Sequence, residues 1–322
     1  MRLKERLIIA GLLFCPGINY AVTCSVNNVQ TINFGAVNPL SGSGTTTSMT
    51  FGYSCTKQVG DVLAGVNLCF NIGASAVSGQ VTTRSMSFAG PPASTLNYQL
   101  YQDSGHSTLW GSQTQAGTSP PMVQLTLLDL VPVTGSLTVY GQIATPQTAA
   151  APGNYQDNYT AATANVTVNI GLLAPPTTCG STVAATFPFT VSAIVTKQCN
   201  ISYANNLNFG TVNPKQTNVT TSNTLGVACS NSTPYTIGLQ PSNGNTAGNG
   251  VMKGTGSNTD QVPYQLSSTT GPSGTPWGNT SQNNIAGTGT GATKAYTVYA
   301  TVPGANYTPD NYADTVTVAV TY

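Results

Sequence analysis

Four aspartates are the side chains in this sequence best suited to acid–base chemistry. Asp157 and Asp310 occupy matching places in two D-N-Y motifs, and Asp103 and Asp129 are further acids in the first half of the chain. A pair of carboxylates could support glycoside hydrolysis. An aspartate that recurs in a repeated loop motif is, however, typical of a residue that caps its own turn. We therefore interpret Asp157 and Asp310 as turn residues.

His106 is the single histidine, so a Ser–His–Asp site would have to use it. It lies in the polar segment DSGHSTLW, and no G-x-S-x-G nucleophile motif accompanies it. The sequence also contains no C-x-x-C pair, which argues against a zinc site. We predict a protein that is not an enzyme and that needs neither a metal nor a cofactor.

The N-terminus and the composition indicate an exported protein. Residues 1–21 have the form of a secretory signal peptide, with Arg2, Lys4 and Arg6 before the apolar run LIIAGLLF and cleavage expected after Ala21. Only 5% of residues are charged, nine basic and eight acidic. That balance provides no electrostatic footprint for nucleic acid or anionic lipid, so we exclude those partners.

Six of the seven cysteines follow this leader, and an even number of cysteines in an exported protein is typical of disulfides. Two of the possible pairs have nearly the same spacing, and each follows the same opening motif. If the cysteines of each copy of this motif pair with each other, the two remaining cysteines form a third pair. The predicted disulfides are Cys24–Cys55, Cys69–Cys179 and Cys199–Cys229.

Internal repetition organises the rest of the chain. The opening CSVNNVQTINFGAVNP (24–39) returns as CNISYANNLNFGTVNP (199–214). Four later pairs keep the same order: LNYQLYQD and VPYQLSST, TLWGS and TPWGN, LTVYGQI and YTVYATV, GNYQDNY and ANYTPDNY. Repetition at this length indicates two copies of one domain. We expect a first domain over 22–180, a linker with a first strand segment over 181–198, and a second domain over 199–322. Residues 185–195 of the linker segment alternate, and the sequence allows this segment either to complete the first domain or to begin the second.

Most of the repeated segments alternate apolar and polar residues, with Gly, Pro and Asn between them, and none has a helical period. This pattern predicts an all-β protein made of antiparallel β-sandwiches. The last segment, YADTVTVAVTY, is a strand with no partner strand after it. We therefore expect an incomplete second sandwich, whose open groove another chain fills. The predicted groove residues are Val316, Val318, Val320 and Tyr322.

The Cys…FGxVNP opening, the Y-Q-L strand, the W-G element and the terminal Y-x-D-T-V-T-V-x-V-x-Y together resemble the spore coat protein U domain family, the subunits of archaic (Csu-type) chaperone–usher pili. The resemblance implies immunoglobulin-like sandwiches that lack their last strand. A periplasmic chaperone fills the gap, an outer-membrane usher assembles the fibre, and the neighbouring subunit then donates a strand. It also implies export through the periplasm to the cell surface.

A shaft subunit both receives and donates a strand, whereas here Cys24 follows the expected cleavage site almost directly and leaves no donor extension. We therefore expect a tip adhesin at the end of the fimbrium. Apolar loops of the first domain would attach it to abiotic hydrophobic or host surfaces and support biofilm formation. The predicted adhesive residues are Ala149, Ala150, Ala151 and Pro152, with Val62, Leu63, Ala64, Pro91 and Pro92 as companions.

Two alternatives share the predicted fold. One is a structural shaft or coat subunit without an adhesive role. The other is a lectin-like tip, in which Trp110 and Tyr101 stack on a sugar ring, although the counterpart of Trp110 at Trp277 favours a core role. We expect the apolar run from Met122 to Val131 to be a core strand rather than part of a site.

Overall fold

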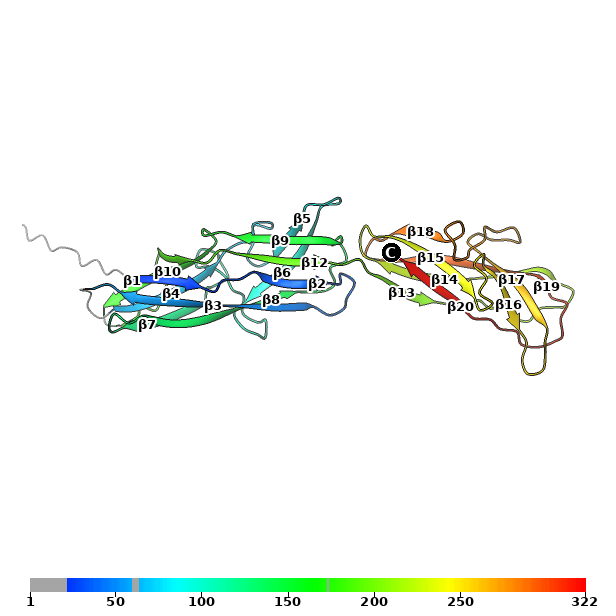
Figure 1. Ribbon diagram of the computed structural model, residues 1–322, viewed down its shortest axis with the longest axis horizontal. Helices are drawn as coiled ribbons and strands as arrows, with labels where there is room; N and C mark the ends of the chain where they lie inside the picture. Colours follow the sequence, from blue (N-terminus) through cyan, green and yellow to red (C-terminus); the bar gives the residue numbers. More distant parts are fainter. Residues whose placement is uncertain (1–21, 60–63, 173) are drawn as a thin grey trace, which may run out of the picture.

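Short alternating segments fold into strands throughout the computed structural model, which describes residues 22–59, 64–172 and 174–322. The predicted signal peptide lies outside these ranges. Twenty strands form two all-β domains that lie end to end (Figure 1). Across the described residues, no helix is long and apolar enough to cross a membrane.

The first domain is a sandwich of two sheets. Its eight-stranded sheet has the order β1-β3-β8-β6-β5-β9-β12-β2, and its four-stranded sheet has the order β11-β10-β4-β7. All neighbouring strands pair antiparallel except β12 and β2, which are parallel. The strands are β1 Val22–Asn27, β2 Ile32–Val37, β3 Thr45–Lys57, β4 Ala64–Ile72, β5 Arg84–Phe88, β6 Ser94–Tyr101, β7 Met122–Leu127, β8 Val133–Ile143, β9 Gly153–Tyr159, β10 Ala164–Leu172, β11 Thr182–Thr186 and β12 Phe189–Val195.

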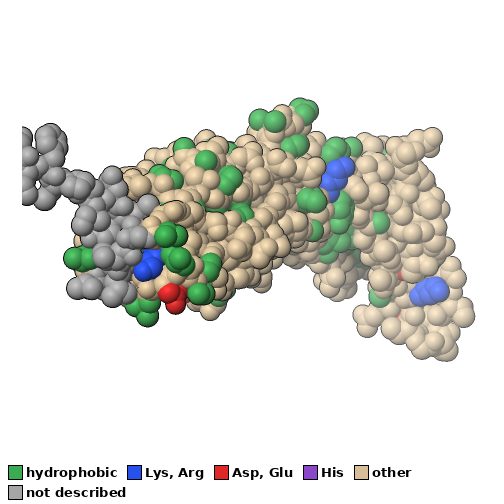
Figure 2. All heavy atoms as spheres, turned by 60° about the vertical axis from the view of Figure 1, so that its left-hand side comes forward, with side chains coloured by type: hydrophobic (Ala, Val, Ile, Leu, Met, Phe, Trp, Pro, Cys, Tyr) green, Lys and Arg blue, Asp and Glu red, His purple; other side chains and the backbone are tan. Residues whose placement is uncertain are grey.

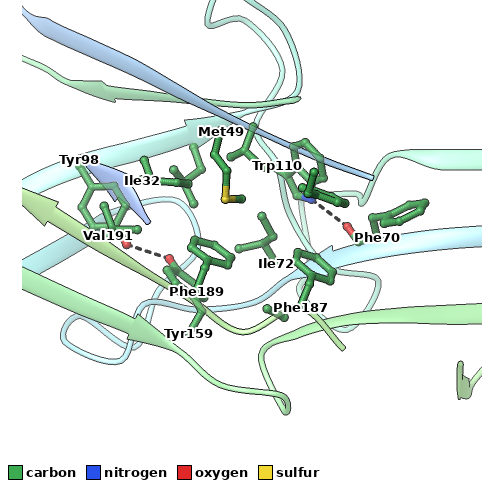
Figure 3. Packing of buried hydrophobic residues seen from close by; sticks show 14 of the residues in the cluster. Ile32, Met49, Phe70, Ile72, Tyr98, Trp110, Tyr159, Phe187, Phe189 and Val191 are labelled. Atoms are coloured by element: carbon green, nitrogen blue, oxygen red, sulfur yellow. Dashed lines mark hydrogen bonds between the residues drawn. The ribbon is translucent and has the colours of Figure 1, made fainter. Parts of the chain in front are cut away.

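Alternation along these strands directs every second side chain inward. Phe51, Phe70 and Phe187 pack together in the core with ring centroids 5.0–6.4 Å apart. Trp110 is buried beside them and donates from Nε1 to the Phe70 carbonyl at 2.8 Å (Figure 3). Trp277 is buried in the same way in the second domain, where it donates to the Ile237 carbonyl at 2.9 Å. The repeated tryptophan is therefore part of the scaffold.

The second domain repeats this plan with fewer strands. Its two sheets have the orders β13-β14-β19-β17-β16 and β18-β15-β20. The strands are β13 Cys199–Ala204, β14 Thr217–Cys229, β15 Pro234–Pro241, β16 Asn249–Lys253, β17 Gln261–Ser267, β18 Ile285–Thr288, β19 Thr293–Gly304 and β20 Val316–Thr321.

The three predicted disulfides are all present. Cys24–Cys55 joins β1 to β3, and Cys199–Cys229 joins β13 to β14 at the matching place. Cys69–Cys179 ties β4 to the segment before β11 and closes a loop of 110 residues. In the chain-entropy model each bridge stabilises its domain by about 3–5 kcal/mol.

The expected linker, residues 181–198, is largely part of the first domain. β11 pairs with β10 in the small sheet, and β12 pairs with β9 and β2 in the large one. The segment thus crosses from one sheet to the other, and Phe187 is buried at the crossing. Only residues 196–198 connect the domains.

Among the residues that the structure describes, few hydrogen bonds join the two domains. The Ser230 amide donates to the Gln198 carbonyl at 2.8 Å, and the Gln198 amide donates to Ser230 Oγ at 3.1 Å. Asn231 Nδ2 donates to the carbonyl of Ala149 at 2.9 Å. The loop before β9 therefore faces the second domain.

Candidate strand-binding groove and distal apolar surface

In the first domain, β12 fills the position between β9 and β2. Phe189, Val191, Ala193 and Val195 point into the core and are buried, while Ile194 faces solvent. Phe189 stacks on Tyr159 with the ring centroids 4.7 Å apart (Figure 3). Main-chain pairing on both sides and alternate buried side chains make this strand an integral part of the sandwich.

The same position in the second domain is an open groove of about 960 Å³. No strand pairs with residues 205–216 or 305–312, which border it, in the described part of the chain. The groove lining includes Leu207, Phe209, Tyr264, Leu266, Val298, Tyr312, Val316 and Val318.

The repeated NFGxVNP motif shows what the missing strand changes. In the first domain this motif contributes β2, where Ile32, Phe34 and Val37 are buried against β12 and its neighbours. In the second domain the equivalent Leu207 and Phe209 are only half-buried and line the groove. The equivalent side chains are thus less buried in the second domain, because no strand of the described residues lies beside them.

Two of the four predicted groove residues line the groove: Val316 and Val318. Val320 packs against the core of the second domain, and Tyr322 is about half exposed. The prediction missed the residues before β14 and those of β17 and β19. Phe209 could have been found from the repeat, since it stands in the same N-F-G-x-V-N-P motif as Phe34.

A tyrosine–aspartate hydrogen bond aligns the two copies differently from the sequence comparison. Tyr98 donates to Asp157 at 2.6 Å, and Tyr264 donates to Asp314 at 2.6 Å. Ser87 pairs with Gln156 just as Lys253 bridges to Ala313, so Asp157 corresponds to Asp314. The matching of Asp157 with Asp310 was wrong by four residues.

The predicted turn role holds for only one of these two aspartates. Asp310 accepts from the amide and hydroxyl of Thr255 and from Asn258, and these hydrogen bonds hold its pKa below the usual range. Asp157 is instead buried in β9, where it also accepts from the Ala76 amide at 3.0 Å. Asp157 is therefore a buried strand residue and not a turn residue.

Asp157 belongs to a buried polar cluster with Tyr98 and Tyr159, whose hydroxyls lie 2.9 Å apart (Figure 3). Burial raises the pKa of Tyr159 to about 12. Burial, with Tyr159 and Asp157 close by, raises the pKa of Tyr98 well above its usual range. Both tyrosines are therefore neutral hydrogen-bonding groups of the core.

The other candidates for acid–base chemistry lie apart from this cluster. Asp103 accepts from the amides of Ser107 and Thr108, which lowers its pKa, and His106 lies in the same turn. Asp129 accepts from the Val131 amide in the turn between β7 and β8. These contacts are those of turn-capping residues.

The predicted adhesive loop at 149–152 is not an exposed patch. Ala150 and Ala151 are 1% and 2% exposed, Pro152 is half-buried, and exposed Ala149 contacts the second domain through its carbonyl. The prediction was wrong because it took β10 for the last strand, running toward the linker. β12 has that role, so the loop before β9 lies at the linker end.

The other predicted adhesive residues do not lie together at the distal end. Pro91 and Pro92 are exposed in the turn between β5 and β6, but Ser94 beside them contacts the Ala151 amide, so this turn also lies at the linker end. Ala64 begins β4. Val62 and Leu63 lie outside the described residues.

The opposite end of the first domain carries an apolar surface that the sequence analysis had assigned to the core. Leu128, Leu130 and Val131, in the turn after β7, are 65%, 52% and 67% exposed. Thr56 Oγ1 donates to the Leu130 carbonyl, which places this turn beside the end of β3 and exposed Val59. We call Val59, Leu128, Leu130 and Val131 the distal apolar surface.

Hydrophobic side chains gather at this end of the molecule, together with basic and acidic ones (Figure 2). Strand register confirms the location. β3 begins opposite Ile143, near the linker end, and its Cys55 lies opposite Val133 at the other end. Eleven paired residues separate the two points by roughly 35 Å. Turn residues between two apolar strands carry no periodic signal, so the exposure was not readable from sequence.

Fold and groove together define a two-domain all-β protein whose first sandwich is completed by its own chain and whose second leaves a strand position open. The family model for the Spore Coat Protein U domain matches residues 13–162 and again 185–319. The chain therefore belongs to the spore coat protein U domain family, as the repeated motifs predicted.

One solved complex shows the same fold at low identity. The chaperone–tip adhesion subunit complex CsuC–CsuE of archaic chaperone–usher Csu pili from Acinetobacter baumannii is 17% identical, with a TM-score of 0.52 over 93% of this chain and 100% of that one. CfaE, the adhesive subunit of CFA/I fimbria of enterotoxigenic Escherichia coli, is 11% identical over 91% and 93%, with a TM-score of 0.32. A search of curated proteins found no significant match.

Proposed function

We propose that this protein is a fimbrial tip adhesin that a periplasmic chaperone and an outer-membrane usher assemble through strand donation into its second domain. The open groove carries the proposal, because the first domain shows the same position filled by a strand. An extended segment with apolar residues at alternate positions would bind there through main-chain hydrogen bonds and side-chain pockets. Membership of the spore coat protein U domain family and the likeness to a chaperone–tip subunit complex support it.

The direction of β12 indicates how a fibre would continue. β12 runs toward the linker end of the first domain, antiparallel to β9. A donated strand with the same orientation would run away from the first domain (Figure 1). A subunit that donates its N-terminal segment would then lie beyond the second domain. The distal apolar surface would remain free at the fibre end, which favours a tip over a shaft position.

Co-expression with a periplasmic chaperone of the chaperone–usher class tests this assignment. Val318 lines the groove, whereas Thr317 beside it on β20 is exposed. We expect Val318→Lys to abolish co-purification with the chaperone, because it places a charge in an apolar pocket, and Thr317→Lys to preserve it. Phe209→Ser, which changes a loop residue and leaves the strands intact, should also weaken it. Undiminished co-purification of both groove variants would refute strand binding.

A further inference from the structure

A second concave site lies on the outer face of the eight-stranded sheet. It is a cleft of about 280 Å³ between β6, β8 and the segment before β5. Its lining includes Thr82, Thr83, Asn97, Tyr101 and Gln142. It is separate from the strand-binding groove, which belongs to the other domain, and from the distal apolar surface.

A buried arginine organises the floor of this cleft. Arg84 Nη2 donates to the carbonyls of Ile72, Gly73 and Trp110 at 2.7–3.1 Å, and Nη1 donates to Gln99 Oε1 at 2.5 Å. Gln99 in turn donates to the carbonyls of Val81 and Thr82. This chain of hydrogen bonds fixes both strand and loop, so the cleft is pre-formed.

The groups that surround the floor have unused hydrogen-bonding capacity. The side chains of Asn97, Gln142, Thr82 and Thr83 make no hydrogen bond to the described residues. Tyr101 adds an aromatic ring whose neighbour His106 meets it edge-on. Amide and hydroxyl groups next to an aromatic face suit a ligand with many hydroxyls and some apolar surface.

The repeat shows that these residues are not required by the fold. Tyr98 and Leu100 recur in the core of the second domain as Tyr264 and Leu266. Gln99 of the cleft floor also recurs, as Gln265. The other cleft residues differ: by strand register, the counterparts of Arg84, Asn97, Tyr101 and Gln142 are Gly250, Pro263, Ser267 and Thr301. The cleft is thus specific to the first domain.

We infer that this cleft is a binding site for a neutral saccharide, of the size of one sugar ring or the end of a longer chain. Gln142 and Asn97 would hydrogen-bond ring hydroxyls, and Tyr101 would contact the apolar face of the ring. Arg84 is a positioning residue that acts through Gln99. The cleft volume of about 280 Å³ is just below the roughly 300–1,000 Å³ usual for ligand sites, which favours a small ligand.

Nuclear magnetic resonance of the full mature chain with glucose, galactose, mannose and N-acetylglucosamine, each up to roughly 50 mM to reach weak affinities, tests the inference. We expect at least one sugar to shift the amide signals of β6 and β8. Gln142→Ala and Tyr101→Leu should each weaken that binding about tenfold, the usual effect of one lost contact. Tyr299→Leu, at the equivalent position of β19 in the second domain and outside the cleft, is the matched control.

Absence of any sugar-dependent shift would overturn the inference, as would equal binding by all three variants. Binding of sialic acid alone would overturn the neutral-saccharide assignment and point to an anion site near Arg84. None of these measurements depends on fibre assembly, so their outcome is independent of the proposed tip function.

Discussion

At the scale of single residues, Tyr98 and Tyr264 show how the two copies keep one interaction in different surroundings. Each donates to an aspartate at 2.6 Å. In the first domain the acceptor Asp157 is buried, and Tyr159 adds a second hydroxyl. In the second, Asp314 is half-buried beside the groove. The hydrogen bond therefore belongs to the shared scaffold, while its burial depends on the neighbouring strand.

Alkaline pH should destabilise the first domain through these tyrosines. The folded-state pKa of Tyr159 is about 12, above the ordinary value of 10.0. Because the folded pKa is the raised one, this stabilisation is complete below pH 10 and is lost as pH rises toward 12, where the unfolded chain releases a proton that the folded domain keeps. We expect the free energy of unfolding to fall by about 1.4 kcal/mol per pH unit for each such tyrosine.

Urea unfolding of the chain at a series of pH values, followed by the nuclear magnetic resonance amide signals of β6 and β9 in the first domain, measures this slope. Tyr159→Phe removes one titrating group, so its stability should be lower at neutral pH but should fall less steeply above pH 10. An unchanged slope in the variant would contradict the assignment of Tyr159.

At the scale of elements, β12 is the strand that distinguishes a closed sandwich from an open one. Segment 182–195 passes along the first domain, pairs in both sheets and buries Phe187 where it crosses. The second domain has the apolar walls for such a strand and leaves them facing a groove. Comparison of the two domains therefore shows what this strand adds to a sandwich: it covers apolar residues that otherwise line a groove.

A charge on the inner face of β12 should open the first domain. Val191 is 0% exposed, so Val191→Asp would bury a carboxylate without a partner and should cost about 4 kcal/mol or more. Ile194→Asp on the same strand, where the side chain is 51% exposed, should change the stability by less than about 0.5 kcal/mol. Urea unfolding measures both, and similar midpoints for the two variants would contradict the role of β12.

At the scale of the whole molecule, the two apolar features lie in different domains. The distal apolar surface lies at the end of the first domain far from the linker, and the groove belongs to the second domain. In the described part of the chain, a short connection and a few hydrogen bonds join the two domains. Attachment and assembly should therefore be separable by mutation.

Adhesion to a hydrophobic surface such as polystyrene should depend on the distal apolar surface. The triple change Leu128→Ser, Leu130→Ser and Val131→Ser removes exposed apolar area worth roughly 3 kcal/mol of contact, about a hundredfold in binding. Fibre number, counted by electron microscopy, should not change. The matched control is Pro91→Ser with Pro92→Ser, exposed apolar residues at the linker end. Equal adhesion by the triple variant and the control would place the contact elsewhere.

Local pattern and repetition determined much of this protein from sequence. Alternation along segments such as TVTVAVTY predicted strands, because a pleated strand presents every second side chain to one face. The two copies of the opening motif predicted the disulfides and the family. The unpaired last strand predicted the open groove.

Only the tertiary structure decided where each loop and strand belongs. Sequence alternation marks 185–195 as a strand but does not say which sheet it joins, since either domain offers an apolar edge. The sheet that this segment joins decides which strand of the first domain runs toward the linker. It therefore also decides at which end of the domain the 149–152 loop lies. Turn residues such as Leu128 and Val131 have no periodic signal, so their exposure at the distal end follows from the arrangement of β3, β7 and β8 rather than from their own sequence.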